Sequence, residues 1–229
     1  MWANASGWSG DTPLPPNNWL SKVRTSAWEW SRERGQFYYH QYQPAQPDLN
    51  YRNRCVGTLT DSCSSGHFSL VIEEMKNILS FWLEFDAGID GVRMDAISHL
   101  IEDARLLDEP ESQDPGAGDE LDWNYLEHIY TNNQNLTRDI VAELTAFVKE
   151  NYGNETVVIL ETDLSVPEVM DYYSCGDIPF NFNLARHIND DVTAEKLLTE
   201  IELWLEAMPS GGDPNWVTGS HDISRVATR

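Results

Sequence analysis

Basic residues are scarce in this chain of 229 residues, where 15 lysines and arginines stand against 38 aspartates and glutamates. The formal net charge is −23 at pH 7 and the sequence pI is near 4.3. A protein that binds nucleic-acid phosphates needs a basic surface, so we expect no nucleic-acid partner. The acidity bears on solubility rather than on the fold.

Cysteines and long apolar runs are also scarce. The three cysteines, Cys55, Cys63 and Cys175, are too few for a disulfide scaffold, and their spacing matches no metal site. Cys55 and Cys63 can pair, and free or buried thiols are the alternative. No apolar run reaches the length of a membrane span, and residues 1–6 lack the basic and apolar regions of a signal peptide. We therefore expect membrane attachment only through an anchor outside this chain.

Three Asn-x-Ser/Thr triplets begin at Asn4, Asn135 and Asn154. Each triplet can arise by chance, and each is also an acceptor sequence for N-glycosylation in secreted proteins. Together they favour a glycoprotein that is secreted or lies on the extracellular face of the plasma membrane.

Aromatic residues are abundant at the start of the chain. Residues 1–53 are rich in Trp, Tyr, Pro, Asn and Gln and predict an irregular subdomain with a short strand near residues 37–40. The rings can form a small core or stack on sugar rings, and both alternatives stay open. Residues 54–70 are rich in Ser, Gly and Thr without a clear period, which predicts an atypical insertion.

From residue 71 onward, helical and strand patterns alternate. Apolar residues at three- and four-residue steps predict helices over 71–86, 136–152 and 197–208, the last begun by a Thr193 cap. Shorter helices are expected over 99–107 and 123–130. Apolar runs predict strands over 88–94, 156–160, 178–184 and 215–219. The alternation predicts an α/β fold with a parallel sheet.

Three of the predicted strands are followed by an acidic side chain. Asp95, Glu161 and Asp222 lie some sixty residues apart along the chain. Because parallel strands share one direction, we expect the three acids at the carboxyl edge of the sheet. Barrel enzymes and open α/β sheets both bind their ligands at that edge.

The neighbours of these acids suggest different chemical roles. Arg93 lies two residues before Asp95 on the same side of the predicted strand, and its charge is expected to keep Asp95 ionised and nucleophilic. Glu161 follows an apolar run, where desolvation raises the pKa of a carboxyl group and suits a general acid/base. Asp222, beside His221, is expected to hold sugar hydroxyls and stabilise positive charge.

Two carboxyl groups that flank one bond are the minimum for glycoside hydrolysis. The alternative is that these acids only cap helices or form structural ion pairs.

Residues 90–96 (Asp-Gly-Val-Arg-Met-Asp-Ala) resemble the nucleophile motif of the α-amylase superfamily of glycoside hydrolases. Glu161 after its apolar run is similar to the acid/base strand of that family. Residues 219–225 (Gly-Ser-His-Asp-Ile-Ser-Arg) resemble its Asn-His-Asp motif. The motifs occur in the family's order and at similar spacing.

Two further segments resemble one branch of this family. Residues 46–50 (Gln-Pro-Asp-Leu-Asn) resemble the segment that marks oligo-1,6-glucosidases and maltases. Residues 15–21 (Pro-Pro-Asn-Asn-Trp-Leu-Ser), with Ala27 and Trp28, are similar to insect-type maltases. The resemblance covers nearly the whole chain except residues 54–70.

The resemblance implies a partial (β/α)8 TIM barrel, with strands four to seven over residues 71–229. Residues 1–53 would be part of the subdomain inserted between strand three and helix three. It also implies an α-glucosidase that cleaves maltose, short malto-oligosaccharides or sucrose by a retaining double displacement. Asp95 would be the nucleophile and Glu161 the acid/base, while Asp222, Arg93 and His221 would act on the substrate. An Ala at position 96 resembles members that prefer α-1,4 bonds.

No cofactor is implied, although calcium occurs in parts of the family. The acid-rich loop at residues 108–122 does not match a calcium-loop spacing, so we expect a solvated acidic loop.

The chain departs from the family pattern in three ways. Ser220 stands where the family has Asn. Residues 54–70 interrupt a join that is direct in relatives, which suggests a retained intron or a gene-model error. The family's first three strands, eighth strand and C-terminal β-domain have no counterpart, so we expect a fragment that neither folds stably nor acts alone. The alternative function is that of a non-catalytic relative, such as an amino-acid transporter heavy-chain ectodomain.

Overall fold

A computed structural model describes residues 1–52, 70–85, 88–114, 116–189 and 191–228 of the chain. The chain divides into two compact units. The first contains residues 1–71 and 99–134, and the second contains residues 72–98 and 135–229. The predicted insertion lies outside the described residues up to position 69, as do Cys55 and Cys63. The assignment of residues 1–53 to an inserted subdomain stays a prediction.

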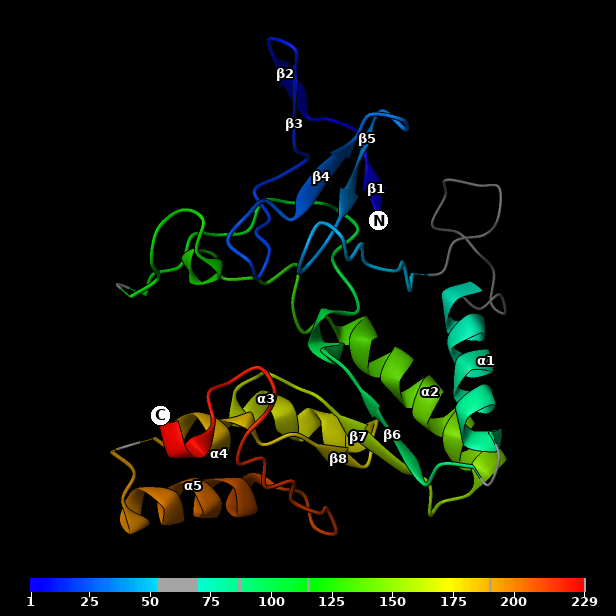
Figure 1. Cartoon of the computed structure of the whole chain (residues 1–229), viewed down its shortest axis with the longest axis vertical. Helices are drawn as coiled ribbons and strands as arrows, with labels where there is room; N and C mark the ends of the chain where they lie inside the picture. Colours follow the sequence, from blue (N-terminus) through cyan, green and yellow to red (C-terminus); the bar gives the residue numbers. More distant parts are fainter. Residues whose placement is uncertain (53–69, 86–87, 115, 190, 229) are drawn as a thin grey trace. The chain divides into compact units, whose positions relative to one another are not determined.

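The first unit contains two small antiparallel sheets (Figure 1). One has the strand order β1-β5-β4, and the other is a hairpin of β2 and β3. The strands are β1 (Trp2–Ala3), β2 (Gly7–Ser9), β3 (Thr12–Leu14), β4 (Trp28–Ser31) and β5 (Gln36–Tyr39). The short strand predicted near residues 37–40 is therefore confirmed.

Aromatic rings form the core of the first unit. Trp19 stacks on Trp28 with ring centroids 5.7 Å apart, and both rings form T-shaped pairs with Tyr39. All three side chains are buried. Stacked and edge-on aromatic pairs add to the free energy gained from burying the rings. These three rings therefore form a small core, rather than a surface on which sugar rings could stack.

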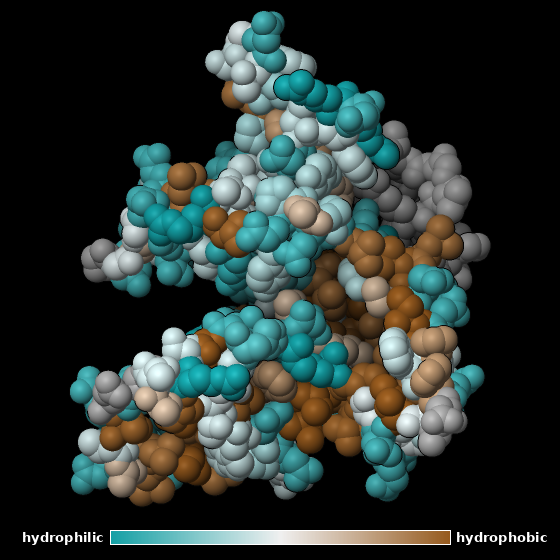
Figure 2. All heavy atoms as spheres, viewed as in Figure 1, coloured by the Kyte–Doolittle hydropathy of each residue, from teal (hydrophilic) through white to brown (hydrophobic). Residues whose placement is uncertain are grey.

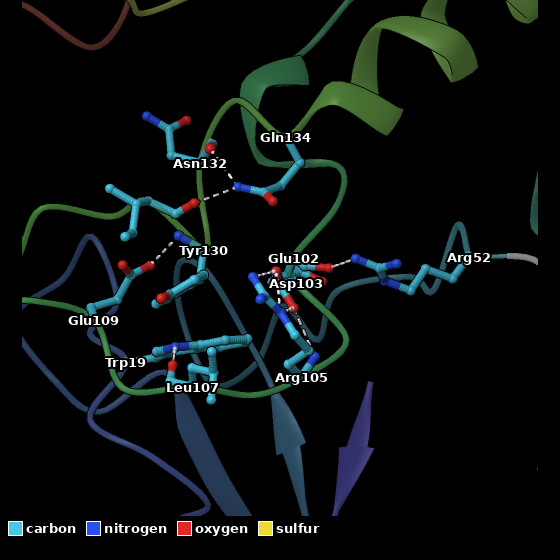
Figure 3. A network of polar contacts seen from close by, with 11 residues as sticks. Trp19, Arg52, Glu102, Asp103, Arg105, Leu107, Glu109, Tyr130, Asn132 and Gln134 are labelled. Carbon is cyan, nitrogen blue, oxygen red and sulfur yellow. Dashed lines mark hydrogen bonds and ion pairs between the residues drawn. The ribbon is translucent and has the colours of Figure 1, made fainter. Parts of the chain in front are cut away.

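The segment from residue 100 to residue 134 is mostly irregular and is tied by polar contacts (Figure 3). Trp19 Nε1 donates to the Leu107 carbonyl at 2.8 Å, and the Tyr130 N–H donates to Glu109 Oε1 at 2.8 Å. Gln134 Nε2 donates to the carbonyls of Ile129 and Asn132. These contacts fix a long connection that has little secondary structure of its own.

The helices predicted in this segment were wrong. The described residues instead form two 3₁₀ turns: η1 (Ile97–His99), which ends where the first predicted helix begins, and η2 (Trp123–Tyr125), which covers the start of the second. Asp103 Oδ1 accepts the Arg105 backbone N–H at 2.8 Å, and such local side-chain bonds compete with a helix. The second turn ends at Leu126, whose backbone is extended, with φ −115° and ψ 155°.

The second unit is built on a parallel sheet with the order β6-β7-β8 (Figure 1). The strands are β6 (Gly91–Met94), β7 (Val157–Leu160) and β8 (Ile178–Pro179). Val158 and Leu160 are fully buried, as expected of a central parallel strand. The predicted parallel α/β sheet is confirmed, and the described strands do not close into a barrel.

Three amphipathic helices of this unit are confirmed: α1 (Leu70–Glu84), α2 (Asn135–Tyr152) and α5 (Ala194–Ala207). Thr193 caps α5, since its side chain accepts the Lys196 N–H at 3.2 Å. The shorter helical elements are α3 (Val166–Met170), η3 (Asp171–Ser174), α4 (Phe182–His187) and η4 (Val226–Thr228). None of the described helices combines the length and the apolar character needed to cross a bilayer.

Two predicted strands of this unit need correction. The strand predicted over 178–184 ends at Pro179, because Asn181 accepts the Leu184 N–H and begins α4. Residues 215–219 do not form the predicted strand. A single backbone bond joins Asn181 N–H to the Asn215 carbonyl, and no ladder follows in the described residues. The apolar run was therefore insufficient to define a strand without a partner.

Candidate active site

The ends of β6 and β7 bring two carboxyl groups together. The register pairs Met94 with Leu160, so the next residues, Asp95 and Glu161, leave the sheet side by side. The Glu161 N–H donates to the Met94 carbonyl at 2.9 Å, which extends the ladder by one bond. The Asp95 and Glu161 carboxyl groups are near enough for each to shift the pKa of the other.

Arg93 bridges the two acids. Its Nη1 lies 2.8 Å from Asp95 Oδ1, and its Nη2 lies 2.9 Å from Glu161 Oε1. The Asp95 side chain is 73% exposed, whereas that of Glu161 is 13% exposed. The guanidinium carbon also lies 5.4 Å from the centre of the Phe180 ring. One arginine thus contacts residues from the ends of all three parallel strands.

The second oxygen of Glu161 is held by the backbone. The Ala96 N–H donates to Glu161 Oε2 at 2.7 Å. Ala96 has a φ of +43°, in the left-handed region that costs an L-residue about 1 kcal/mol. With Arg93 on one oxygen and Ala96 on the other, the Glu161 carboxyl group has a fixed orientation.

The two carboxyl groups have pKa values shifted in opposite directions. The hydrogen bond from Glu161 lowers the pKa of Asp95, and the Arg93 and His221 charges add to this effect. Burial raises the pKa of Glu161, and the hydrogen bond with Asp95 raises it further. The directions agree with those predicted from the sequence. However, the main cause for Asp95 is Glu161 rather than Arg93. A pair with separated pKa values suits one nucleophile and one proton donor.

The third predicted acid lies apart from this pair. Asp222 and His221 are exposed, and His221 Nε2 lies 3.4 Å from Asp222 Oδ2. The Ser220 hydroxyl accepts the Asp222 N–H at 3.1 Å and shapes this turn. In the described part of the chain, no hydrogen bond or ion pair joins Asp222 to Asp95 or Glu161. His221 is near enough for its charge to act on Asp95.

Two features of the site were not predicted from the sequence, Phe180 and the Ala96 N–H. Phe180 was assigned to a strand without a role, and the Ala96 N–H is a backbone group that no motif displays. Both depend on the strand register that places them beside Arg93 and Glu161. An aromatic residue directly after the third parallel strand was the available signal for Phe180.

The acid-rich loop at residues 108–122 uses several carboxylates for local contacts. Arg24 pairs with Asp119 at 2.6 Å and with Asp122 at 2.5 Å. Asp119 and Asp122 also accept the backbone N–H two residues further on, as in Asx turns. Across the described ranges, no group of three or more His, Cys, Asp or Glu side chains is arranged to hold a metal ion.

Comparisons with known proteins match the whole chain. The profile of the alpha amylase catalytic domain matches residues 1–229. Salivary alpha-glucosidase of Aedes aegypti is 36% identical over 96% of this chain, and Maltase A1 of Drosophila melanogaster is 37% identical over 94%. The crystal structure of the alpha-glucosyl transfer enzyme XgtA has a TM-score of 0.77 and 26% identity, over 100% of this chain and 39% of that one.

The matches cover only part of each relative. The chain spans 37% of the length of each of the two insect proteins. The amino acid transporter heavy chain SLC3A1 of Rattus norvegicus is 32% identical over 100% of this chain and 32% of its own length.

Proposed function

Since the chain belongs to the alpha-amylase catalytic-domain family, we propose that its second unit carries the hydrolytic site of an α-glucosidase. It releases terminal α-1,4-linked glucose from maltose and short malto-oligosaccharides, and sucrose is a further substrate. The observation that carries the proposal is the pair of Asp95 and Glu161 at neighbouring strand ends, bridged by Arg93 and with pKa values shifted in opposite directions. The insect relatives named α-glucosidase and maltase support it.

The reaction divides into two displacements. The Asp95 carboxylate attacks the anomeric carbon while Glu161 gives its proton to the leaving glycosidic oxygen. The products of this step are a β-glucosyl ester on Asp95 and the released alcohol or sugar. Glu161, now ionised, takes a proton from water as that water attacks the anomeric carbon and frees Asp95. Glucose leaves with the α configuration of the substrate.

The closeness of the two acids favours this route over single displacement. Inverting enzymes separate their carboxyl groups by about 6.5–9.5 Å to admit a water between acid and sugar, whereas retaining enzymes use about 5–5.5 Å. One guanidinium reaches both carboxyl groups, with Nη1 at 2.8 Å from Asp95 and Nη2 at 2.9 Å from Glu161, which supports the closer spacing.

Asp222 and His221 are proposed to contact sugar hydroxyls. Their support is the resemblance of residues 219–225 to the family motif, together with the action of the His221 charge on Asp95. The proposed preference for α-1,4 bonds is supported only by the resemblance at Ala96.

The test is the turnover of 4-nitrophenyl-α-glucoside by the longest polypeptide that the gene encodes around these residues. Asp95→Asn should lose at least 1,000-fold in kcat, because the amide cannot form the ester. Asp90→Asn is the matched control, since Asp90 is an exposed aspartate at the opposite end of β6. Equal activity of the two variants would contradict the proposal.

A second candidate is a non-catalytic role like that of the rat transporter heavy chain, favoured by the 32% match. This reading predicts no turnover by the wild-type protein and no difference between the two variants. The intact and oriented acid pair supports the enzyme instead.

The secretory route is proposed for the same polypeptide. Asn4, Asn135 and Asn154 are all exposed, so each can carry a glycan without disturbing the core. The relatives from Aedes aegypti and Anopheles gambiae are named salivary α-glucosidases, which supports secretion.

A further inference from the structure

We propose that Phe180 is a positioning residue of this site, whose ring holds the Arg93 guanidinium in the orientation that bridges Asp95 and Glu161. The inference rests on the proposed function and adds a residue that no motif assigned. A phenyl ring can neither give nor take a proton, so Phe180 acts on the acids through Arg93, whose guanidinium carbon lies 5.4 Å from the ring centre.

The backbone fixes Phe180 beside the acid pair. The Phe180 N–H donates to the Leu160 carbonyl at 2.8 Å, directly before Glu161. The next residue, Asn181, is buried and caps α4 through the Leu184 N–H at 3.1 Å. The backbone of Phe180 is therefore held between the end of β8 and the start of α4.

Arg93 needs such a support. Its side chain is 34% exposed, and an ion pair at that exposure contributes little once side-chain entropy and solvent screening are counted. A guanidinium at 5.4 Å from an aromatic centroid lies within the range of cation–π attraction. While it lies over the ring, the same guanidinium has Nη1 at 2.8 Å from Asp95 and Nη2 at 2.9 Å from Glu161. Phe180 thus selects the bridging conformation among those open to a flexible arginine.

Phe182 provides a matched control. Its ring lies 5.3 Å from that of Phe180, edge to face, and both side chains are partly buried. Among the described residues, no cation–π contact joins Phe182 to Arg93. A change at Phe182 removes similar apolar volume from the same cluster but leaves the arginine contact intact.

Displacement of Arg93 should shift the pKa values of both acids in the same direction. Burial and the contact between the two acids also act on their pKa values. The Arg93 charge lowers the pKa of both Asp95 and Glu161. If Arg93 loses its bridging position, both pKa values rise. Loss of apolar packing alone would not move the two pKa values upward together.

The experiment compares Phe180→Leu, Phe180→Tyr and Phe182→Leu in the longest encoded polypeptide, by the pH profile of kcat/KM on 4-nitrophenyl-α-glucoside. Phe180→Leu should lower kcat/KM by about twofold to tenfold and move both limbs of the profile to higher pH. Phe180→Tyr keeps the aromatic face and should restore the wild-type limbs. Phe182→Leu should leave both limbs in place. Unchanged limbs in Phe180→Leu would overturn the proposal, even with a lower kcat/KM.

A second measurement does not depend on turnover. Carbon-13 titration of the Asp95 and Glu161 carboxyl groups, assigned with Asp95→Asn and Glu161→Gln, reads both pKa values directly. Phe180→Leu should raise both values and Phe182→Leu neither. Equal values in wild type and Phe180→Leu would overturn the role of Phe180. A wild-type protein without turnover would instead refute the proposed function while this titration still decides the role of Phe180.

Discussion

At the scale of residues, the site is organised by Arg93 and by the opposite shifts of two carboxyl groups. Three contacts fix Arg93, and two donors fix Glu161. Arg93, Asp95 and Glu161 could be predicted from the sequence, because charged residues at the end of an apolar strand form a recognisable pattern. Phe180 and the Ala96 N–H could not, since their role follows from the register of strands far apart in the chain.

The raised pKa of Glu161 predicts the basic limb of the pH profile. Kcat/KM should fall at a higher pH than the ordinary pKa of a glutamate, because the proton donor is lost only when Glu161 ionises. The acidic limb should lie below the ordinary pKa of an aspartate, since Asp95 stays ionised. Glu161→Gln should lose kcat by about 100-fold or more and lack the basic limb. A basic limb that survives in this variant would assign the acid role elsewhere.

At the scale of elements, periodic patterns were reliable and isolated apolar runs were not. The helices α1, α2 and α5 repeat apolar residues over three or more turns, and their bounds matched the prediction closely. The failures at 99–107, 178–184 and 215–219 have other causes. Polar side chains such as Asp103 and Asn181 bind nearby backbone groups, and a strand also needs a neighbour to pair with.

Two carboxyl groups, those of Glu102 and Asp48, should make the stability of the first unit depend on pH. Burial and the nearby Asp48 raise the pKa of Glu102 to about 8, and burial raises that of Asp48 to about 6. A carboxyl group with a raised pKa binds its proton more tightly in the folded state. The free energy of unfolding should therefore be highest near pH 4 and fall as the pH rises toward 8.

Glu102→Gln should remove most of this dependence. At pH 8 it should raise the Tm of the first unit by about 5 °C, the shift expected of roughly 1 kcal/mol. At pH 4 the Tm should be nearly unchanged. The measurement is thermal unfolding of the longest polypeptide that the gene encodes, followed by tryptophan fluorescence, with a chelator present so that no divalent cation shields the carboxylates. Glu120→Gln, at an exposed position, is the control. A Tm gain that is equal at both pH values would contradict this cause.

At the scale of the whole molecule, the second unit leaves large apolar side chains in contact with solvent. Figure 2 shows apolar surface over α1 and α5. The exposed side chains of α1 include Phe81 (57%) and Trp82 (50%), and those of α5 include Leu198 (53%) and Leu203 (49%). Exposed apolar patches of this kind mark interfaces or aggregation-prone surfaces.

These faces predict that the 229-residue chain by itself has no cooperative thermal unfolding transition. We expect it to bind the dye ANS and to associate, because α1 and α5 present large apolar side chains to solvent. Calorimetry and ANS fluorescence of the purified chain are the measurements. A sharp two-state transition together with maltose hydrolysis would contradict this expectation.

The central claim is that Asp95 forms a covalent bond to glucose. A 5-fluoroglucosyl fluoride of α configuration is a slow substrate whose ester with the nucleophile accumulates. Peptide mass spectrometry of the treated, full-length gene product should find one 5-fluoroglucosyl group on the Asp95 side chain, and none in Asp95→Asn. A label on Glu161 or Asp222 would contradict the account, as would turnover of this substrate without any labelled peptide.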